Sequence, residues 1–170
     1  MPVQAFRVHA DWTSTAMDTV YCSDESNELQ RLLELNLDLI PGDQINEDEP
    51  RRWLLVKREM PVDSPDTGKA TWSIDLFIVD QDGMPTLVEC KRARDTRSRR
   101  EVVGQMLDYA ANGHFYWTRE RLREDAERTA QQRGTSVEAS LAAIGADDPD
   151  EVDTFFDRVV ENRFFPTSCG

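Results

Sequence analysis

A pair of β-type segments joined by a tight turn constrains this chain more than any other feature. The segments 71–80 (TWSIDLFIVD) and 84–92 (MPTLVECKR) are rich in apolar and β-branched residues. The turn between them, DQDG, ends in Gly83 at a position that needs a positive φ. This arrangement predicts an antiparallel hairpin. The preceding segment 51–60 (RRWLLVKREM) alternates along its length and predicts a further strand, so we expect a β-sheet at the centre of the fold.

Helical patterns lie before and after these strands. Segment 24–40 opens with capping residues and repeats leucine at helical spacing. Segment 98–111 carries an apolar stripe and ends at an Asn-Gly pair. We also expect a short strand at 4–10, a fourth strand of the sheet at 114–118, and two or three helices after residue 119 that pack on the sheet. The apolar positions of those last helices are Val137, Leu141, Ile144, Phe155, Phe156, Val159 and Val160.

Length and composition favour one folded domain. The chain has 170 residues, of which 39% are hydrophobic, and this is enough for a core that needs no disulfide or structural metal. We expect one α/β domain over 1–170, with a central mixed β-sheet flanked by helices in a core at about 24–118 and a helical C-terminal extension at about 119–170. The sequence shows neither a membrane-spanning apolar run nor a leader-like start, so we expect a cytoplasmic protein without membrane contact.

Cysteine and histidine are too few and too scattered for a zinc site. The three cysteines, Cys22, Cys90 and Cys169, lack C-x-x-C spacing, and the two histidines are His9 and His114. A catalytic metal ion would therefore be held by oxygen atoms. We interpret the histidines as structural and the Cys90 side chain as a small buried apolar group.

The charge of the chain is unevenly distributed. The formal net charge is −13, yet residues 91–117 carry six basic and three acidic residues. An acidic protein repels nucleic acid as a whole, whereas a local basic cluster is the surface that a polyanion would contact. The alternative is a solvated helix start on an acidic protein. The basic residues of this cluster are Lys91, Arg92, Arg94, Arg97, Arg99 and Arg100.

Three ionisable residues converge on the predicted hairpin. Asp75 and Glu89 are nearly equidistant from the turn and should be neighbours across the strands, while Lys91 shares a face with Glu89. Two carboxylates this close repel each other unless a cation lies between them, and Mg²⁺ prefers carboxylate and carbonyl oxygens. We therefore expect a metal site formed by Asp75, Glu89 and the backbone carbonyl of Cys90. Lys91 is one of only three lysines among 20 basic residues, which suggests a point charge that holds a water or a phosphate oxygen.

These residues resemble the signature of the PD-(D/E)XK nuclease superfamily. That signature is an aspartate on one strand followed by Glu-x-Lys on the next, and it is matched here by Asp75, Glu89 and Lys91. Ile74 stands where the signature has proline, a position that varies in the superfamily.

The following helix strengthens the resemblance. Gln105 and Tyr109 match the Q-x-x-x-Y pattern of RecB-like nucleases, and their i, i+4 spacing places both on one helix face. The chain from about 28 to 111 is especially similar to the nuclease domain of the mismatch endonucleases called NucS or EndoMS. In those enzymes a glutamate of the leading helix joins the metal site, and Glu28 matches it.

The resemblance implies a restriction-endonuclease-like core and metal-dependent hydrolysis of DNA, in DNA repair or in defence against foreign DNA. Mg²⁺ or Mn²⁺ held by Asp75, Glu89 and Glu28 would activate water and offset negative charge in the transition state. Lys91 would orient that water or steady the scissile phosphate. Gln105 would position Lys91 or the backbone, and Tyr109 a neighbouring phosphate. The arginines Arg92, Arg94, Arg97, Arg99 and Arg100 would neutralise the DNA phosphates beside the cut.

Each assignment has an alternative. Glu89 and Lys91 could form a simple salt bridge, and Asp75 could be a solvent-facing acid of an edge strand. Glu28 could only stabilise the helix dipole, since Glu25 and Glu34 lie on the same predicted helix.

Gln105 and Tyr109 could likewise form an ordinary helix flank. For the whole chain, the alternative is a catalytically inactive module of this fold that binds nucleic acid or protein. Its C-terminal helices would then be a dock for a protein partner or for a second copy of the chain.

Overall fold

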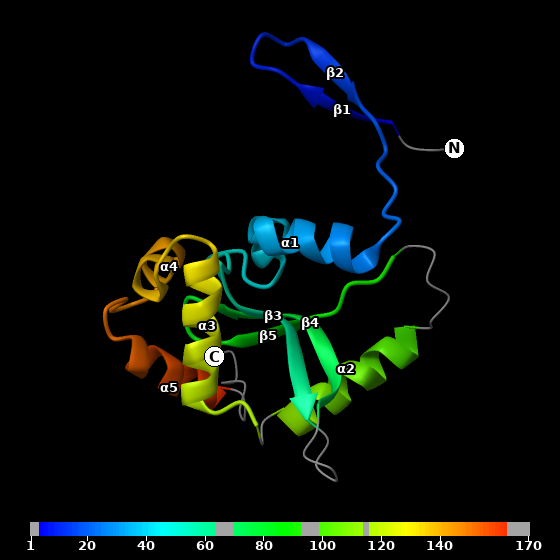
Figure 1. Ribbon diagram of the computed structural model, residues 1–170. Coiled ribbons are helices and arrows are strands. Elements are labelled where there is room, and N and C mark those ends of the chain that lie inside the picture. Colours follow the sequence, from blue (N-terminus) through cyan, green and yellow to red (C-terminus); the bar gives the residue numbers. More distant parts are fainter. Residues whose placement is uncertain (1–3, 64–69, 93–98, 114–115, 163–170) are drawn as a thin grey trace.

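The structure is a mixed α/β fold built around a three-stranded antiparallel sheet (Figure 1). The computed structural model describes residues 4–63, 70–92, 99–113 and 116–162, with side chains described for these except at positions 63, 70, 71, 99, 100 and 111–113. The sheet has the order β3-β4-β5, and its strands are Trp53–Asp63, Ala70–Asp80 and Pro85–Val88. The predicted hairpin is confirmed, because β4 and β5 pair antiparallel.

Helical segments precede and follow the sheet in the chain. Before it lie a π-helical turn η1 at Glu25–Gln30, α1 at Arg31–Leu35, and short 3₁₀ turns η2 at Leu37–Leu39 and η3 at Gly42–Gln44. After it lie α2 at Arg99–Gly113, α3 at Arg119–Gln132, α4 at Val137–Ile144 and α5 at Val152–Asn162. Among the described residues, no helix is long and apolar enough to cross a membrane.

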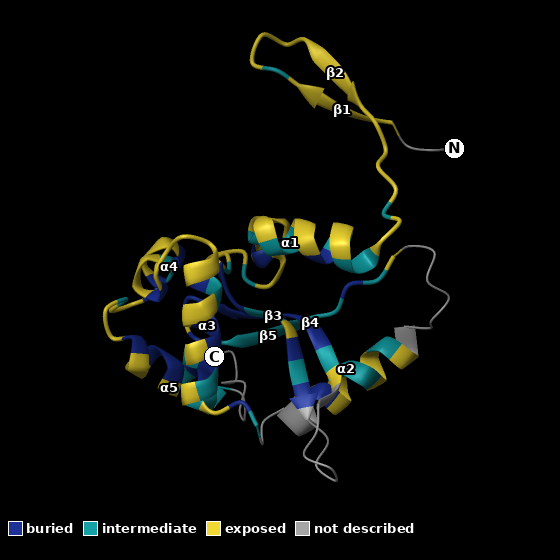
Figure 2. Ribbon diagram, in the orientation of Figure 1, coloured by how far each residue is buried: buried dark blue, intermediate teal, exposed yellow. Residues whose placement is uncertain are grey.

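The sheet carries apolar clusters on both faces, because side chains of a strand alternate between them. On one face Leu55 and Ile78 pack against Leu33 and Leu37 of the N-terminal helical segment. On the other face Leu54, Phe77 and Val79 belong to a larger cluster with the C-terminal helices. Figure 1 shows α1 above the strands and α3 to α5 to their left, and Figure 2 shows that the central strands are mostly buried.

The helices after residue 119 supply much of the larger cluster. The expectation that they pack on the sheet is confirmed by their buried side chains, which include Leu122, Val137, Leu141, Phe155, Phe156 and Val159. Thr118 caps α3 by accepting a hydrogen bond from the backbone N–H of Arg121, and Gly145 ends α4 with a left-handed φ of 72°.

Two expectations about the sheet differ from the structure. The strands that are described all pair antiparallel, so the expected mixed sheet is not found among them. Residues 114 and 115 of the expected fourth strand lie outside the described residues. Residues 116–118 form a turn and a short link that ends in the Thr118 cap of α3. A capping residue must leave its backbone free to start a helix, which removes it from a strand ladder.

The leading helix is also shorter and less regular than the segment 24–40 predicts. Asn36 has φ −139° and ψ 68°, outside the helical region, and it separates α1 from η2. Leu32 and Leu35 are exposed, whereas Leu33 and Leu37 pack against the sheet. The leucine repeat therefore predicted the helix but not which leucines are buried.

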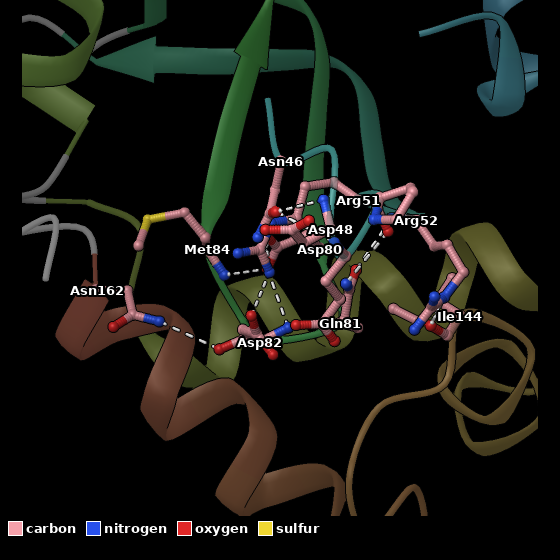
Figure 3. A network of polar contacts seen from close by, with 12 residues as sticks. Asn46, Asp48, Arg51, Arg52, Asp80, Gln81, Asp82, Met84, Ile144 and Asn162 are labelled. Atoms are coloured by element: carbon pink, nitrogen blue, oxygen red, sulfur yellow. Dashed lines mark hydrogen bonds and ion pairs between the residues drawn. The ribbon is translucent and has the colours of Figure 1, made fainter. Parts of the chain in front are cut away.

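The turn between β4 and β5 is fixed by a polar network (Figure 3). Asp80 Oδ1 accepts hydrogen bonds from the backbone N–H groups of Asp82 and Met84 at 3.0 and 2.8 Å. Arg51 forms an ion pair with Asp82 and lies 3.5 Å from Asp80. Gly83 has the positive φ that the sequence predicts, 78°. Because the turn is fixed, so is the register that extends from it toward Asp75.

A second, smaller sheet lies near the N-terminus. Strands β1 (Ala5–Val8) and β2 (Ser14–Met17) form an antiparallel hairpin, and all residues of the two strands are exposed (Figure 2). The expected short strand at 4–10 is confirmed, while β2 was not expected. Within the described chain, this hairpin contributes no residue to either apolar cluster.

Candidate active site

The hairpin register brings Asp75 opposite Glu89. The last pair of the ladder is Leu76 with Val88, so Asp75 and Glu89 occupy the next positions along the two segments, Glu89 one residue beyond the end of β5. The Asp75 carboxylate is buried and accepts two hydrogen bonds. Its Oδ1 accepts from the side-chain amide of Gln30 at 2.6 Å, and its Oδ2 from the backbone N–H of Cys90 at 2.5 Å.

Burial makes Asp75 a weaker acid than usual. Desolvation raises the pKa of Asp75 from 3.8 to about 6, the Cys90 N–H opposes this shift, and the negative charge of Glu89 adds to it. A cation placed beside this desolvated carboxylate would stabilise its charged form. The interpretation of Asp75 as a solvent-facing acid is wrong, because its exposed fraction is 8%.

Glu89 is the centre of a second set of contacts. Its Oε1 lies 2.6 Å from Nζ of Lys91, and the same oxygen accepts a hydrogen bond of 3.3 Å from the amide of Gln105. That amide also donates to the phenolic oxygen of Tyr109, so α2 contacts Glu89 through the predicted Gln-Tyr pair. The other oxygen, Oε2, is buried and has no hydrogen-bond partner.

Lys91 lies between two carboxylates. Burial of the ammonium works against its charge, but the hydrogen bond to Glu89 and the nearby Glu25 and Asp75 outweigh this, and the pKa of Lys91 is raised. Glu25 Oε1 is 3.5 Å from Nζ of Lys91. The Lys91 side chain is therefore charged at neutral pH, and its ammonium group is held beside the Glu89 carboxylate.

Gln30 and Arg58 are parts of the cluster that the sequence analysis missed. Gln30 is buried, and its Oε1 accepts a hydrogen bond of 3.2 Å from Arg58 Nε of β3. Arg58 is held in turn by Glu34 at 3.1 Å and by the backbone carbonyl and hydroxyl of Ser26. A signal for Gln30 existed, since it precedes the inward-facing Leu33 by three positions and so shares a helix face with it.

The structure does not bring Glu28 to this cluster through any described contact. Its carboxylate is exposed and accepts hydrogen bonds from the backbone N–H and the hydroxyl of Ser23, at 2.7 and 2.6 Å. These two hydrogen bonds lower the pKa of Glu28. Positions two apart lie on nearly opposite faces of a helical turn, so Gln30 faces Asp75 and Glu28 faces away.

Cys90 contributes a backbone donor. Its thiol is buried, and desolvation, followed by nearby carboxylates, raises the pKa of Cys90 to about 12, so the thiol stays protonated. The expected role of its backbone carbonyl is not tested by these contacts.

The basic cluster is described only in part. Arg94 and Arg97 lie outside the described residues, and Arg99 and Arg100 begin α2 with side chains that are not described. Arg92 is described: its Nη1 donates to the Ser23 carbonyl at 2.9 Å, and its Nε lies 3.9 Å from Glu25.

The donor set fits an oxygen-ligated divalent cation. In the described part of the chain, no group of three or more His, Cys, Asp or Glu side chains could hold a metal. Mg²⁺, however, is commonly bound by one or two carboxylates and several waters. Asp75 and Glu89 supply two carboxylates, and the buried Glu89 Oε2 is an acceptor without a hydrogen-bond donor among the described residues.

The fold and these contacts define a mixed α/β protein with a buried carboxylate pair and an adjacent lysine. In comparisons with protein-family models, with curated proteins and with solved structures, no family model, curated protein or solved structure matches the chain. Its function must therefore be argued from the cluster itself.

Proposed function

We propose that the chain is a Mg²⁺- or Mn²⁺-dependent DNA endonuclease with a restriction-endonuclease-like core of the PD-(D/E)XK type. The observation that carries the proposal is the partnerless, buried Oε2 of Glu89 beside the desolvated carboxylate of Asp75. A buried acceptor without a partner is costly, by about 1–3 kcal/mol, and a cation between the two carboxylates would remove that penalty. The protein would act in the cytoplasm, in DNA repair or in defence against foreign DNA.

Each residue of the cluster has a role that its contacts support. Asp75 and Glu89 would hold the cation, which when bound supplies Lewis acidity to a water and to the scissile phosphate. Lys91 keeps a positive charge beside the Glu89 carboxylate and would hold a phosphate oxygen or the attacking water. Gln105 fixes Glu89 by hydrogen bonding, and Tyr109 fixes Gln105.

A pocket beside the cluster is a candidate contact surface for DNA. Its volume is about 360 Å³, and Gln105, Tyr109 and the exposed Trp72 are part of its lining. An exposed tryptophan offers a face on which a base of single-stranded DNA can stack. The arginines Arg92, Arg94, Arg97, Arg99 and Arg100 would contact DNA phosphates, so that binding weakens with salt.

The direct test is cleavage of plasmid, single-stranded and branched DNA in the presence of Mn²⁺. We expect the wild-type protein to cleave at least one of these, and Lys91→Ala and Asp75→Ala to lose activity by about a hundredfold or more. Asp38→Ala, which changes an exposed aspartate of η2, is the matched control and should keep full activity. Circular dichroism must show all three variants folded. Undiminished cleavage by both cluster variants would refute the proposal.

One observation favours a second candidate, a non-catalytic module that binds nucleic acid or protein. Lys91 already neutralises Glu89 at 2.6 Å, so the pair can be stable without any metal. The two candidates differ in thermal melting with and without Mn²⁺. A metal site raises the melting temperature as the Mn²⁺ concentration increases, by a stabilisation of RT ln(1 + [L]/Kd), and Glu89→Gln abolishes the effect. Absence of any Mn²⁺ effect would favour the binding module.

A further inference from the structure

The carboxylate of Glu25 lies in a ring of nitrogen donors. Its Oε2 accepts a hydrogen bond of 3.0 Å from the backbone N–H of Arg92, and Nε of the same arginine lies 3.9 Å away. Its Oε1 is 3.5 Å from Nζ of Lys91. Glu25 comes from η1, 66 positions before Lys91, so these contacts join two distant parts of the chain.

The donor set is one that proteins use to bind phosphate. It combines an ammonium, a guanidinium and a main-chain N–H, each of which donates to an oxyanion. A carboxylate has two acceptor oxygens and a negative charge, as a phosphate group has. Glu25 therefore contacts these donors in the way that a phosphate would. The Arg92 side chain is 44% exposed, so the donors are open to solvent on that side.

Several features make the Glu25 contact easy to open. The Lys91–Glu25 distance of 3.5 Å is longer than the 2.6 Å between Lys91 and Glu89. The Lys91 and Glu25 side chains are 20% and 23% exposed, so solvent still screens part of the attraction between their charges. The segment that carries Glu25 is a helical turn of six residues at the start of the leading helical segment.

We propose that Lys91 and Arg92 form a phosphate-binding site and that Glu25 occupies it as an internal competitor, which a phosphate of nucleic acid displaces. The choice of nucleic acid as the natural ligand rests on the proposed function, whereas the site itself does not. The competitor lowers the phosphate affinity in proportion to the fraction of time that the site is free of it. If Glu25 occupies the site about nine-tenths of the time, its removal tightens binding about tenfold.

The test measures binding in EDTA, so that cleavage plays no part. Inorganic phosphate is titrated by calorimetry, and a fluorescent single-stranded oligonucleotide by anisotropy. We expect Glu25→Gln and Glu25→Ala each to tighten both by about tenfold. Adding Lys91→Met to Glu25→Gln should abolish the gain.

Glu34→Gln is the matched control, because it removes the same charge from the same segment but contacts Arg58. We expect its affinity to change less than twofold, since net charge alone has a small effect at physiological salt. Equal gains in Glu25→Gln and Glu34→Gln would reduce the effect to net charge and overturn the proposal. Unchanged or weaker binding in both Glu25 variants, with the fold intact by circular dichroism, would also overturn it.

Metal binding separates this inference from the proposed function. If Glu25 is only a competitor for phosphate, Glu25→Gln leaves the Mn²⁺ affinity unchanged, whereas a large loss would make Glu25 a metal ligand and overturn the inference. Tighter phosphate binding without any DNA cleavage would support the site and count against the nuclease.

Discussion

The side-chain amide of Gln30 donates a hydrogen bond of 2.6 Å to the Asp75 carboxylate, across 45 positions of sequence. Arg58 fixes which end of the amide faces Asp75, because its Nε–H can donate only to the Gln30 oxygen. The amide nitrogen must then point at the carboxylate. Gln30 is thus a positioning residue that stabilises the charged form of Asp75.

Replacing Gln30 should therefore change the acidity of Asp75. Gln30→Met removes the donor with little change of volume, and loss of a hydrogen bond to the charged form raises the pKa of Asp75. A hydrogen bond to a charged group is worth about 1.5 kcal/mol, so we expect the pH midpoint of Mn²⁺ binding to rise by about one unit. Gln131→Met, at an exposed position of α3, is the control and should leave that midpoint in place.

Metal binding itself should depend on pH through Asp75. Its pKa in the folded protein, about 6, exceeds the ordinary value of 3.8 for this side chain. By linkage, the contribution of Asp75 to the free energy of unfolding is complete below about pH 4 and is lost as pH rises through about 6. A cation binds the ionised form, so stabilisation by Mn²⁺ has the opposite dependence.

We expect the increase in melting temperature caused by Mn²⁺ to be small at pH 5 and full by about pH 7 to 8, with a midpoint near 6. Differential scanning fluorimetry over this range measures it. Glu89→Gln should show no Mn²⁺ effect at any pH. An effect of the same size at pH 5 and pH 8 would contradict the assignment of Asp75 as a ligand.

The sequence predicted the hairpin and its polar residues because both follow from local rules. A turn with Gly83 fixes the register, and counting from the turn places Asp75 near Glu89 without knowledge of the rest of the fold. The contact of Gln105 with Tyr109 could be predicted from the sequence, since i, i+4 spacing puts both residues on one helix face. The contact of Gln105 with Glu89 also depends on how the helix packs.

The leading helix could not be oriented in the same way. Which of Glu25, Glu28 and Gln30 reaches the hairpin depends on how the helical turn rotates against the sheet. That rotation is set by the packing of Leu33 and Leu37, not by the identity of the acids. A π-helical turn also changes the angular spacing between residues, and the leucine repeat gives no sign of it. Resemblance alone favoured Glu28, which contacts Ser23 instead.

An ion pair between β3 and α3 whose carboxylate is buried should contribute more stability than surface pairs. Lys57 Nζ lies 2.8 Å from Asp125 Oδ1, Asp125 is 3% exposed, and its Oδ2 is buried without a partner. Among the described residues, Lys57→Met leaves this carboxylate with the exposed Arg128 as its one ion-pair partner, at 3.0 Å. We expect a loss of about 1–3 kcal/mol in the free energy of unfolding, measured by urea denaturation.

The matched comparison is Arg123→Met, which breaks exposed pairs with Glu127 and Asp153. Surface pairs are worth about 0–1 kcal/mol, so this variant should unfold at nearly the wild-type urea midpoint. Equal losses in the two variants would show that burial of Asp125 adds nothing.

The last prediction concerns the hairpin turn, on which the register of Asp75 and Glu89 depends. Gly83 has a φ of 78°, and a Cβ added there would lie 3.4 Å from both the Arg158 Cβ and the backbone nitrogen of Val159. A left-handed residue with a side chain costs about 1–2 kcal/mol, so Gly83→Ala should lower the free energy of unfolding by that amount. Gly104→Ala is the opposite case, because Gly104 lies in α2 and an added Cβ meets nothing within 4 Å. Alanine is favoured over glycine in a helix by about 0.5–1 kcal/mol, so the urea midpoint should rise for Gly104→Ala and fall for Gly83→Ala.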